Sequence, residues 1–262
     1  MDEAPKPNAS ADAPEAKMKL NELREAMAAG NSAETPTPTE FHVEKSELQA
    51  QLNFASPFWP IAQNISSLYS GLLNRMREFG VSSHSIRPDA ADGSLGAFNV
   101  NFWMLQWGVI VRIRLDSVEF SAPNFAVDPD QLEPAFLAVD QSLRDAKPDL
   151  SYSNSAVTIV MHGRLSGTEP KQFLERFVTH APDGLGRLLG CGTVFYFEGP
   201  SPLALLSVTA DLSSSVAGGL VVKVHTVFDE SMKMDALRAM AEQQLERSVK
   251  ALGLVLPAGT RK

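Results

Sequence analysis

The feature that most constrains the fold is a run of alternating residues at positions 98–120, FNVNFWMLQWGVIVRIRLDSVEF. Before Gly108, apolar residues such as Val100 and Phe102 alternate with polar ones, and after Gly108 residues such as Val111 alternate with arginines. Because successive side chains of a strand point to opposite faces of a sheet, this pattern predicts a long hairpin with one apolar and one mixed face. Gly108 is the expected turn or bulge.

Strand and helix patterns follow one another along the rest of the chain. The strand patterns are at residues 41–54, 81–88, 155–165, 192–199, 202–212 and 219–228. The helical patterns begin at Ser56-Pro57, Asp128-Pro129, Thr168 and about residue 231. They end at Gly80, near Pro148, at Phe177 or His180, and near Leu252. Pro134 is expected to kink the second helix or delay its start. The many charges at 41–54 favour a place at a sheet edge.

These patterns predict an α+β fold made of two similar tandem modules. Each module reads strand, helix, about three strands and helix, and its closely spaced strands favour an antiparallel sheet. The expected modules are residues 41–150 and 151–256, with a C-terminal tail at 257–262. Their shared order suggests an internal duplication packed as a pseudo-symmetric pair.

The first 40 residues differ in composition from the rest of the chain. They are rich in Ala, Pro, Glu, Ser and Thr, and they hold eight acidic and four basic residues, a balance of −4. Such a segment buries too little apolar surface to fold alone, so a flexible tail is expected. Within it, Met18, Leu23 and Met27 give a possible short helix an apolar stripe. The tail is therefore either mobile or a docking peptide that folds on a partner or a neighbouring copy.

Charge and cysteine content exclude several classes of protein. The formal net charge is −8 and the sequence pI is about 5.2, which argues against binding to nucleic acid or to an anionic membrane by general electrostatics. The single cysteine, Cys191, cannot form an internal disulfide. Neither a signal peptide nor an apolar run long enough to cross a membrane is recognisable, so a cytoplasmic protein is expected.

The mixed face of the hairpin is the first candidate site. Asn99, Asn101, Trp103, Arg112 and Arg114 are expected to share it. One interpretation is a solvent-facing surface on which the arginine stems cover their neighbours. The other is an exposed amphipathic interaction patch, because tryptophan and arginine are enriched at interface hot spots.

A second candidate lies in the second module. His162, Arg164, Lys223 and His225 fall on two strands in the same alternation, and on neighbouring strands they would form a small cationic patch for an anion. Cys191, between two glycines, is a possible nucleophile with His162 or His225 as its base. A packed cysteine and solvent-facing sheet residues are the simpler interpretations.

No motif predicts a metal or cofactor. The histidines are scattered singly along the chain, and neither HExxH nor paired CxxC occurs. The glycine-rich stretch GLGRLLGCG matches neither a dinucleotide-binding nor a phosphate-binding loop. The expected protein therefore uses no cofactor and holds no metal site.

The leading functional hypothesis is a non-enzymatic interaction or assembly subunit that binds a protein partner or itself, with exposed strand edges such as residues 41–54 available for self-association. The alternative is an α+β protein that binds a small apolar ligand between helices and sheet, since Phe (14) and Met (9) are abundant. A third hypothesis is a hydrolase or transferase that uses Cys191 with a histidine.

Overall fold

The computed structural model describes residues 38–90, 98–104, 108–123, 129–177, 191–230 and 234–257. The strands are β1 (Thr39–Phe54), β2 (Ile86–Ala90), β3 (Phe98–Met104), β4 (Val109–Arg114), β5 (Ser117–Ala122), β6 (Tyr152–Leu165), β7 (Thr193–Phe197), β8 (Leu203–Leu212), β9 (Leu220–Phe228) and β10 (Leu254–Val255). The helical elements are α2 (Pro60–Gln63), α3 (Ile65–Met76), the 3₁₀ turn η1 (Arg77–Phe79), α4 (Pro129–Ala146), α5 (Pro170–Glu175) and α6 (Met234–Ala251).

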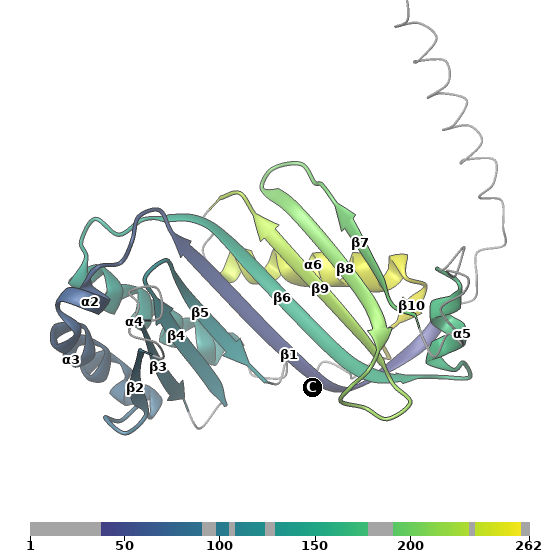
Figure 1. Cartoon of the computed structure of the whole chain (residues 1–262), viewed down its shortest axis with the longest axis horizontal. Coiled ribbons are helices and arrows are strands. Elements are labelled where there is room, and N and C mark those ends of the chain that lie inside the picture. Colours follow the sequence, from purple (N-terminus) through teal and green to yellow (C-terminus); the bar gives the residue numbers. More distant parts are fainter. Residues whose placement is uncertain are drawn as a thin grey trace, which may run out of the picture. The chain divides into compact units, whose positions relative to one another are not determined.

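The strands form one sheet in the order β2-β3-β4-β5-β1-β6-β9-β8-β7 (Figure 1). Neighbours along this path pair antiparallel, and only the short β10 pairs parallel, with the start of β1. Helices and a large antiparallel sheet confirm the predicted α+β class. The division into modules at residue 150 stays a prediction.

The predicted edge position of residues 41–54 is wrong, because β1 lies in the middle of the sheet. It pairs with β6 along its length, from Phe41 to Phe54, and with β5 from Leu48 to Asn53. Its charges do not require an edge, because a central antiparallel strand needs only one apolar face. Glu44, for example, is ion-paired with Arg164 of β6 at 3.0 Å.

A β-bulge explains why the alternation in β1 is loose. The register with β6 shifts between Val43 and Lys45, which leaves Glu44 as an extra residue. The shift changes the parity of the strand, so Phe41 before the bulge and Ala50 after it both face the core, at 0% and 5% exposed. Without the bulge, one of the two would face the other side of the sheet.

The first helix begins later than predicted. Ser56-Pro57 is not its cap, because the Phe58 N–H donates to the Leu115 carbonyl at 2.6 Å and ties this segment to the end of β4. Helix α2 begins at Pro60, and the predicted stop at Gly80 is confirmed by its φ of 75°. This positive φ favours glycine and ends the helix.

The hairpin is confirmed, with β3 and β4 separated at Gly108, whose φ is 65°. Its core face is buried, with Phe102 and Val111 both 0% exposed. Two strands were not predicted: β5, which follows after a tight turn, and β10. The strand predicted at 81–88 lies at Ile86–Ala90 instead.

Helices α4, α5 and α6 largely match the helical patterns of the sequence. Helix α4 runs through Pro134, whose side chain is exposed, and ends at Ala146. Helix α5 has only six residues, and α6 ends at Ala251 as its pattern predicts. None of the helices in the described ranges is long and apolar enough to cross a membrane.

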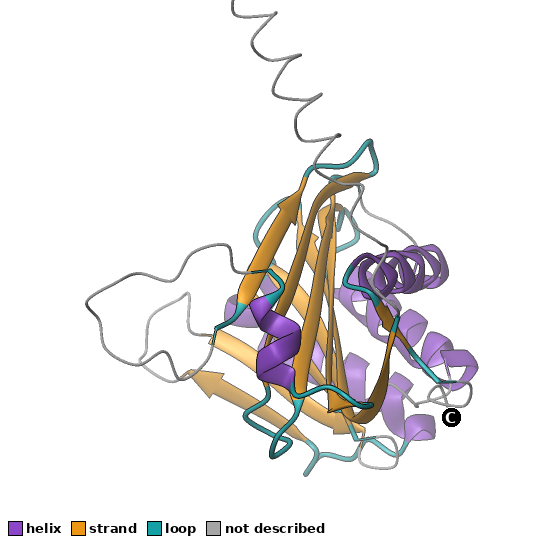
Figure 2. Cartoon of the chain, turned by 90° about the vertical axis from the view of Figure 1, so that its right-hand side faces the viewer, coloured by secondary structure: helices purple, strands orange, loops and turns teal. Residues whose placement is uncertain are grey.

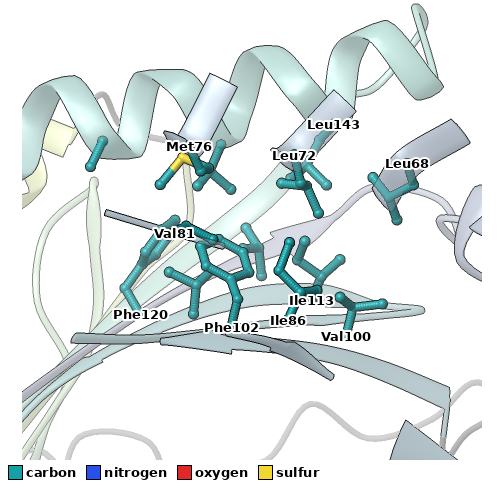
Figure 3. Packing of buried hydrophobic residues seen from close by; sticks show 14 of the residues in the cluster. Leu68, Leu72, Met76, Val81, Ile86, Val100, Phe102, Ile113, Phe120 and Leu143 are labelled. Carbon is teal, nitrogen blue, oxygen red and sulfur yellow. The ribbon is translucent and has the colours of Figure 1, made fainter. Parts of the chain in front are cut away.

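The core consists of two clusters on the same face of the sheet. In one, α3 and α4 pack on β3, β4 and β5; in the other, α5 and α6 pack on β6, β8 and β9. Leu48 and Leu52 of the shared strand β1 contact both clusters. Figure 3 shows Leu72 and Met76 of α3 pointing toward Phe102 of β3, all three fully buried. Burying a side chain of this size contributes about 1.5–3 kcal/mol.

Some predictions fall on residues that the structure does not describe. They are the tail helix with Met18, Leu23 and Met27, the residue His180, and most of the C-terminal tail.

Candidate interaction surface

The helices leave one face of the sheet uncovered. Along β4, buried side chains alternate with partly exposed ones, and the buried set packs against α3 and α4. The buried residues of β6 and β9 likewise pack against α5 and α6. Figure 2 shows the long helices on one side of the strands. We call the opposite side the open face; no helix in the described ranges contributes to a cluster there.

The five hairpin residues singled out above lie together on the open face. Asn99 lies opposite Arg114, and Asn101 opposite Arg112, in the β3–β4 register. Arg112 Nε donates to Asn101 Oδ1 at 3.0 Å, and Asn101 Nδ2 donates to Asn99 Oδ1 at 2.6 Å. Trp103 continues this row along β3 and is partly exposed.

Two further residues complete this surface and were missed in the sequence. Glu119 of β5 lies opposite Arg112, with its Oε2 at 3.7 Å from Arg112 Nη1 and at 3.3 Å from Arg114 Nη2. The Arg87 guanidinium lies over the Trp103 ring, 5.4 Å from its centroid, which is a cation–π contact. These two and the five hairpin residues form what we call the Trp103 patch.

The signal that could have placed Glu119 is the alternation after the hairpin. Val118 and Phe120 are apolar and flank it, and Asp116 marks the turn before the strand. A third strand there puts Glu119 on the arginine-bearing face. Arg87 had no such signal, because its short strand also contains Pro88.

The Trp103 patch is locally cationic on an acidic protein. It holds three arginines and one glutamate, a formal balance of 3 − 1 = +2, whereas the whole chain carries −8. Arg112 and Arg114 are each 39% exposed, whereas the Glu119 they share is 17% exposed. Because each guanidinium has five N–H donors, both arginines keep donors for a partner. Ion pairs this exposed add little to folding stability.

The four residues of the second candidate group lie on the open face, but their side chains do not point toward a common position. His162 and Arg164 on β6 face the same side as Lys223 and His225 on β9. Three of the four already have partners: His162 Nδ1 is 2.9 Å from Ser213 Oγ, Arg164 pairs with Glu44, and His225 Nδ1 is 2.8 Å from Thr158 Oγ1. The anion site stays a prediction, and the arrangement of these four side chains lends it no support.

His225 is also less cationic than its sequence suggests. Burial, and secondly the positive charge of Lys223, hold the pKa of His225 below its usual value. A histidine with a lowered pKa is neutral at pH 7, so it adds no charge with which to attract an anion.

Replacing Lys223 with alanine is expected to raise the pKa of His225, because one of the two causes of its depression is removed. The value should remain below that of an exposed histidine, since burial is the larger cause. Titration of the His225 ring signals by NMR checks this, with Lys250→Ala on α6 as the control. An unchanged pKa in Lys223→Ala would contradict the assigned cause.

Cys191 is partly buried and packs against the core cluster that α5 and α6 form with β6, β8 and β9. None of the hydrogen bonds in the described part of the chain joins it to His162 or His225, whose Nδ1 atoms face hydroxyl groups. Within the same residues, no three His, Cys, Asp or Glu side chains gather as a metal site would require.

A depression of about 470 Å³ lies between α3 and α4. Its lining is mostly polar and charged, with Asn74, Arg75, Arg77, Glu78 and Ala138. Arg75 bridges the two helices by donating from Nε to Asp145 at 3.1 Å. This lining does not match an apolar ligand.

No family model matches the sequence, and no curated protein matches it.

Proposed function

We propose that the protein is a non-enzymatic interaction or assembly subunit, built on a duplicated α+β scaffold, that binds a protein partner through the Trp103 patch. One observation carries the proposal: Trp103 on β3 and the half-exposed Arg112 and Arg114 on β4 lie on the same face of the sheet, which no described helix covers. Tryptophan and arginine are among the residue types most enriched at interface hot spots.

The order of the strands supports the duplication. In the first half, the first strand β1 lies beside the last strand β5; in the second half, β6 lies beside β9. The helices α2, α3 and α4 of the first half and α5 and α6 of the second half pack on the same face of the sheet, and the halves meet where β1 and β6 pair antiparallel. Antiparallel pairing of equivalent strands is what a pseudo-twofold relation between two copies of one module requires.

The fixed geometry of the Trp103 patch favours binding over a merely solvated surface. Arg112 is held by Asn101 and Glu119, and the Trp103 ring is covered on one side by Arg87. Side chains that are already ordered lose less entropy when a partner binds. The positive patch on an acidic chain suits a partner surface rich in carboxylate or carbonyl groups.

The other two hypotheses gain no comparable support. An apolar ligand would need an apolar cavity, yet core residues such as Met76 and Phe102 are 0% exposed and are packed within the same cluster. A Cys/His enzyme would need a base bonded to the thiol of Cys191, and no such bond is found in the described residues.

The test compares Trp103→Ala and Arg112→Glu with the wild type in affinity purification from cells, quantified by mass spectrometry. A specific partner should be retained by the wild type and lost by both variants, with its affinity lowered roughly 30-fold or more, the effect of removing a hot spot of about 2 kcal/mol. Circular dichroism should show both variants folded, because Trp103 and Arg112 are only partly buried.

Leu137→Lys is the matched control, since Leu137 is 60% exposed on α4 and faces away from the sheet. It should retain the partner. If the two patch variants recover the same proteins as the wild type and Leu137→Lys, the Trp103 patch is not the binding surface.

A further inference from the structure

The two edges of the sheet are chemically unlike. At one end, β2 contains Pro88, which has no N–H to offer, flanked by the charged residues Arg87 and Asp89. Proline and charge are the usual means by which proteins prevent a sheet edge from pairing with another strand. At the other end, β7 reads TVFYF, with no charge and no proline (Figure 1). Of the two strands that end this path in the described part of the chain, β7 is the one that lacks this protection.

The β7 edge also exposes large apolar side chains. Val194 is 46%, Tyr196 71% and Phe197 48% exposed, and they are three of the most exposed large hydrophobic residues in the described ranges. Phe195 and Phe197 continue a row of rings from α5, with centroid distances of 5.8 Å from Phe177 to Phe195 and 6.3 Å from Phe195 to Phe197. An apolar row that runs to an open edge is typical of an interaction site.

The register identifies the backbone groups that point outward from β7. Ser213 N–H donates to Gly219 O in the β8–β9 turn at 2.9 Å, and bonded pairs alternate along an antiparallel ladder. The even-numbered residues of β8 therefore bond to β7, where Val208 lies opposite Phe195. The N–H and C=O groups of Val194 and Tyr196 then point away from β8, toward the free edge.

We propose that a second copy of this chain pairs antiparallel with β7, about a two-fold axis through Phe195, and continues the sheet from one molecule into the next. In this register Val194 lies opposite Tyr196 of the second copy as a bonded pair, and about four backbone hydrogen bonds form across the axis. Phe195 lies opposite its own copy as a non-bonded pair. The surface is self-complementary, as a two-fold interface requires.

The charges and side chains of β7 favour a second copy over other occupants. Glu198, the first charge after β7, falls opposite Gly192 of the second copy, so like charges do not meet. On the open face, Val194 packs beside Tyr196, a β-branched and aromatic cross-strand pair of the stabilising kind. The N-terminal segment before β1 is a poor alternative as the strand that pairs with β7. It contains Pro36 and Pro38 and has no alternating apolar run.

The proposal concerns a different surface from the Trp103 patch and stands independently of it. A strand pair of this length buries less surface area than a standard protein–protein interface. A dissociation constant on the order of micromolar is therefore expected. Because each chain carries −8, added salt should strengthen the association by screening repulsion between the copies.

The first experiment is sedimentation equilibrium on the full chain over roughly 1–200 μM, spanning the expected dissociation constant. The wild type should be in monomer–dimer equilibrium. Val194→Pro, which removes one outward N–H without touching the ladder to β8, should raise the dissociation constant at least about tenfold. Val194→Thr, which keeps the N–H and the β-branched shape, should dimerise like the wild type.

Trp103→Ala should also dimerise like the wild type, which separates this proposal from the proposed function. A wild type that stays monomeric throughout, and so leaves the edge to a strand of another protein, would overturn the proposal. So would a dimer that Val194→Pro leaves unchanged.

The second experiment tests the register in a Cys191→Ser background. Together, Val194→Cys and Tyr196→Cys should yield a disulfide-linked dimer under mild oxidation, because bonded antiparallel pairs have Cα atoms about 5.5 Å apart. Either cysteine alone should not, since residue 194 faces 196 and not its own copy. Single variants that cross-link as fully as the double variant would overturn the two-fold pairing about Phe195.

Discussion

Replacing Gly163 with alanine is expected to lower the free energy of unfolding by about 3 kcal/mol, measured by urea denaturation. Gly163 of β6 lies opposite Val43, next to the bulge in β1. A Cβ there would collide with the carbonyl oxygen of His42 and lie 2.9 Å from Cε2 of the fully buried Phe41. The backbone of the two central strands would have to separate to admit one methyl group.

Gly71→Ala is the control, and its effect on the free energy of unfolding should have the opposite sign. Gly71 lies inside α3, and an added Cβ would meet nothing within 4 Å. Alanine is favoured over glycine in a helix interior by about 1 kcal/mol, so Gly71→Ala should stabilise the protein by that amount. Equal effects at the two positions would contradict the close approach of β1 and β6 at Gly163.

Tyr152→Phe is expected to lower the free energy of unfolding by about 2 kcal/mol at pH 7, the cost of losing a hydrogen bond to a charged group. The Tyr152 hydroxyl donates to Asp140 Oδ1 at 2.5 Å, and Arg144 Nε donates to Asp140 Oδ2 at 2.8 Å. Arg144 also lies over the Tyr152 ring, 5.7 Å from its centroid. This network ties α4 to the start of β6.

The effect of Tyr152→Phe should disappear at high pH. Burial, and then the bond to Asp140, raise the pKa of Tyr152 far above its usual value of about 10. The stability that protonated Tyr152 contributes is therefore present below about pH 10 and is lost as pH rises, at about 1.4 kcal/mol per pH unit, because only the unfolded state ionises. The phenylalanine variant has no such loss, so the two stabilities should converge near about pH 11.5.

Urea denaturation of both proteins between about pH 7 and pH 11.5 measures this convergence. Tyr69→Phe is a matched variant at pH 7, because the Tyr69 hydroxyl donates to the carbonyl oxygens of Ser83 and Ile86 rather than to a carboxylate. Its expected cost there is about 1 kcal/mol, smaller than at Tyr152. A constant difference between Tyr152→Phe and the wild type across the pH range would rule out the raised pKa.

Periodicity in the sequence was sufficient to predict the elements whose faces differ in polarity. Phe102 and Val111 were placed on the buried face of the hairpin, and Asn101 and Arg112 on the other, because alternation within one strand is a local property. The same holds for Leu237 and Leu245 of α6, both buried as the helical spacing predicts. Five residues of the Trp103 patch were therefore recognisable from two strand patterns alone.

The neighbours of each strand were not recognisable in this way, because pairing joins residues far apart in the chain. The charges of β1 predicted an edge, yet contacts with β5 and β6 place it in the centre. Glu119 and Arg87 joined the Trp103 patch only through strands adjacent in space. Residues 193–197 read as an ordinary strand, and the order of the described strands is what shows that they lie at an end of the sheet. Local alternation is enough to tell which side of a strand is apolar. Which strands pair depends on the tertiary structure, because register and strand order arise from packing between distant segments.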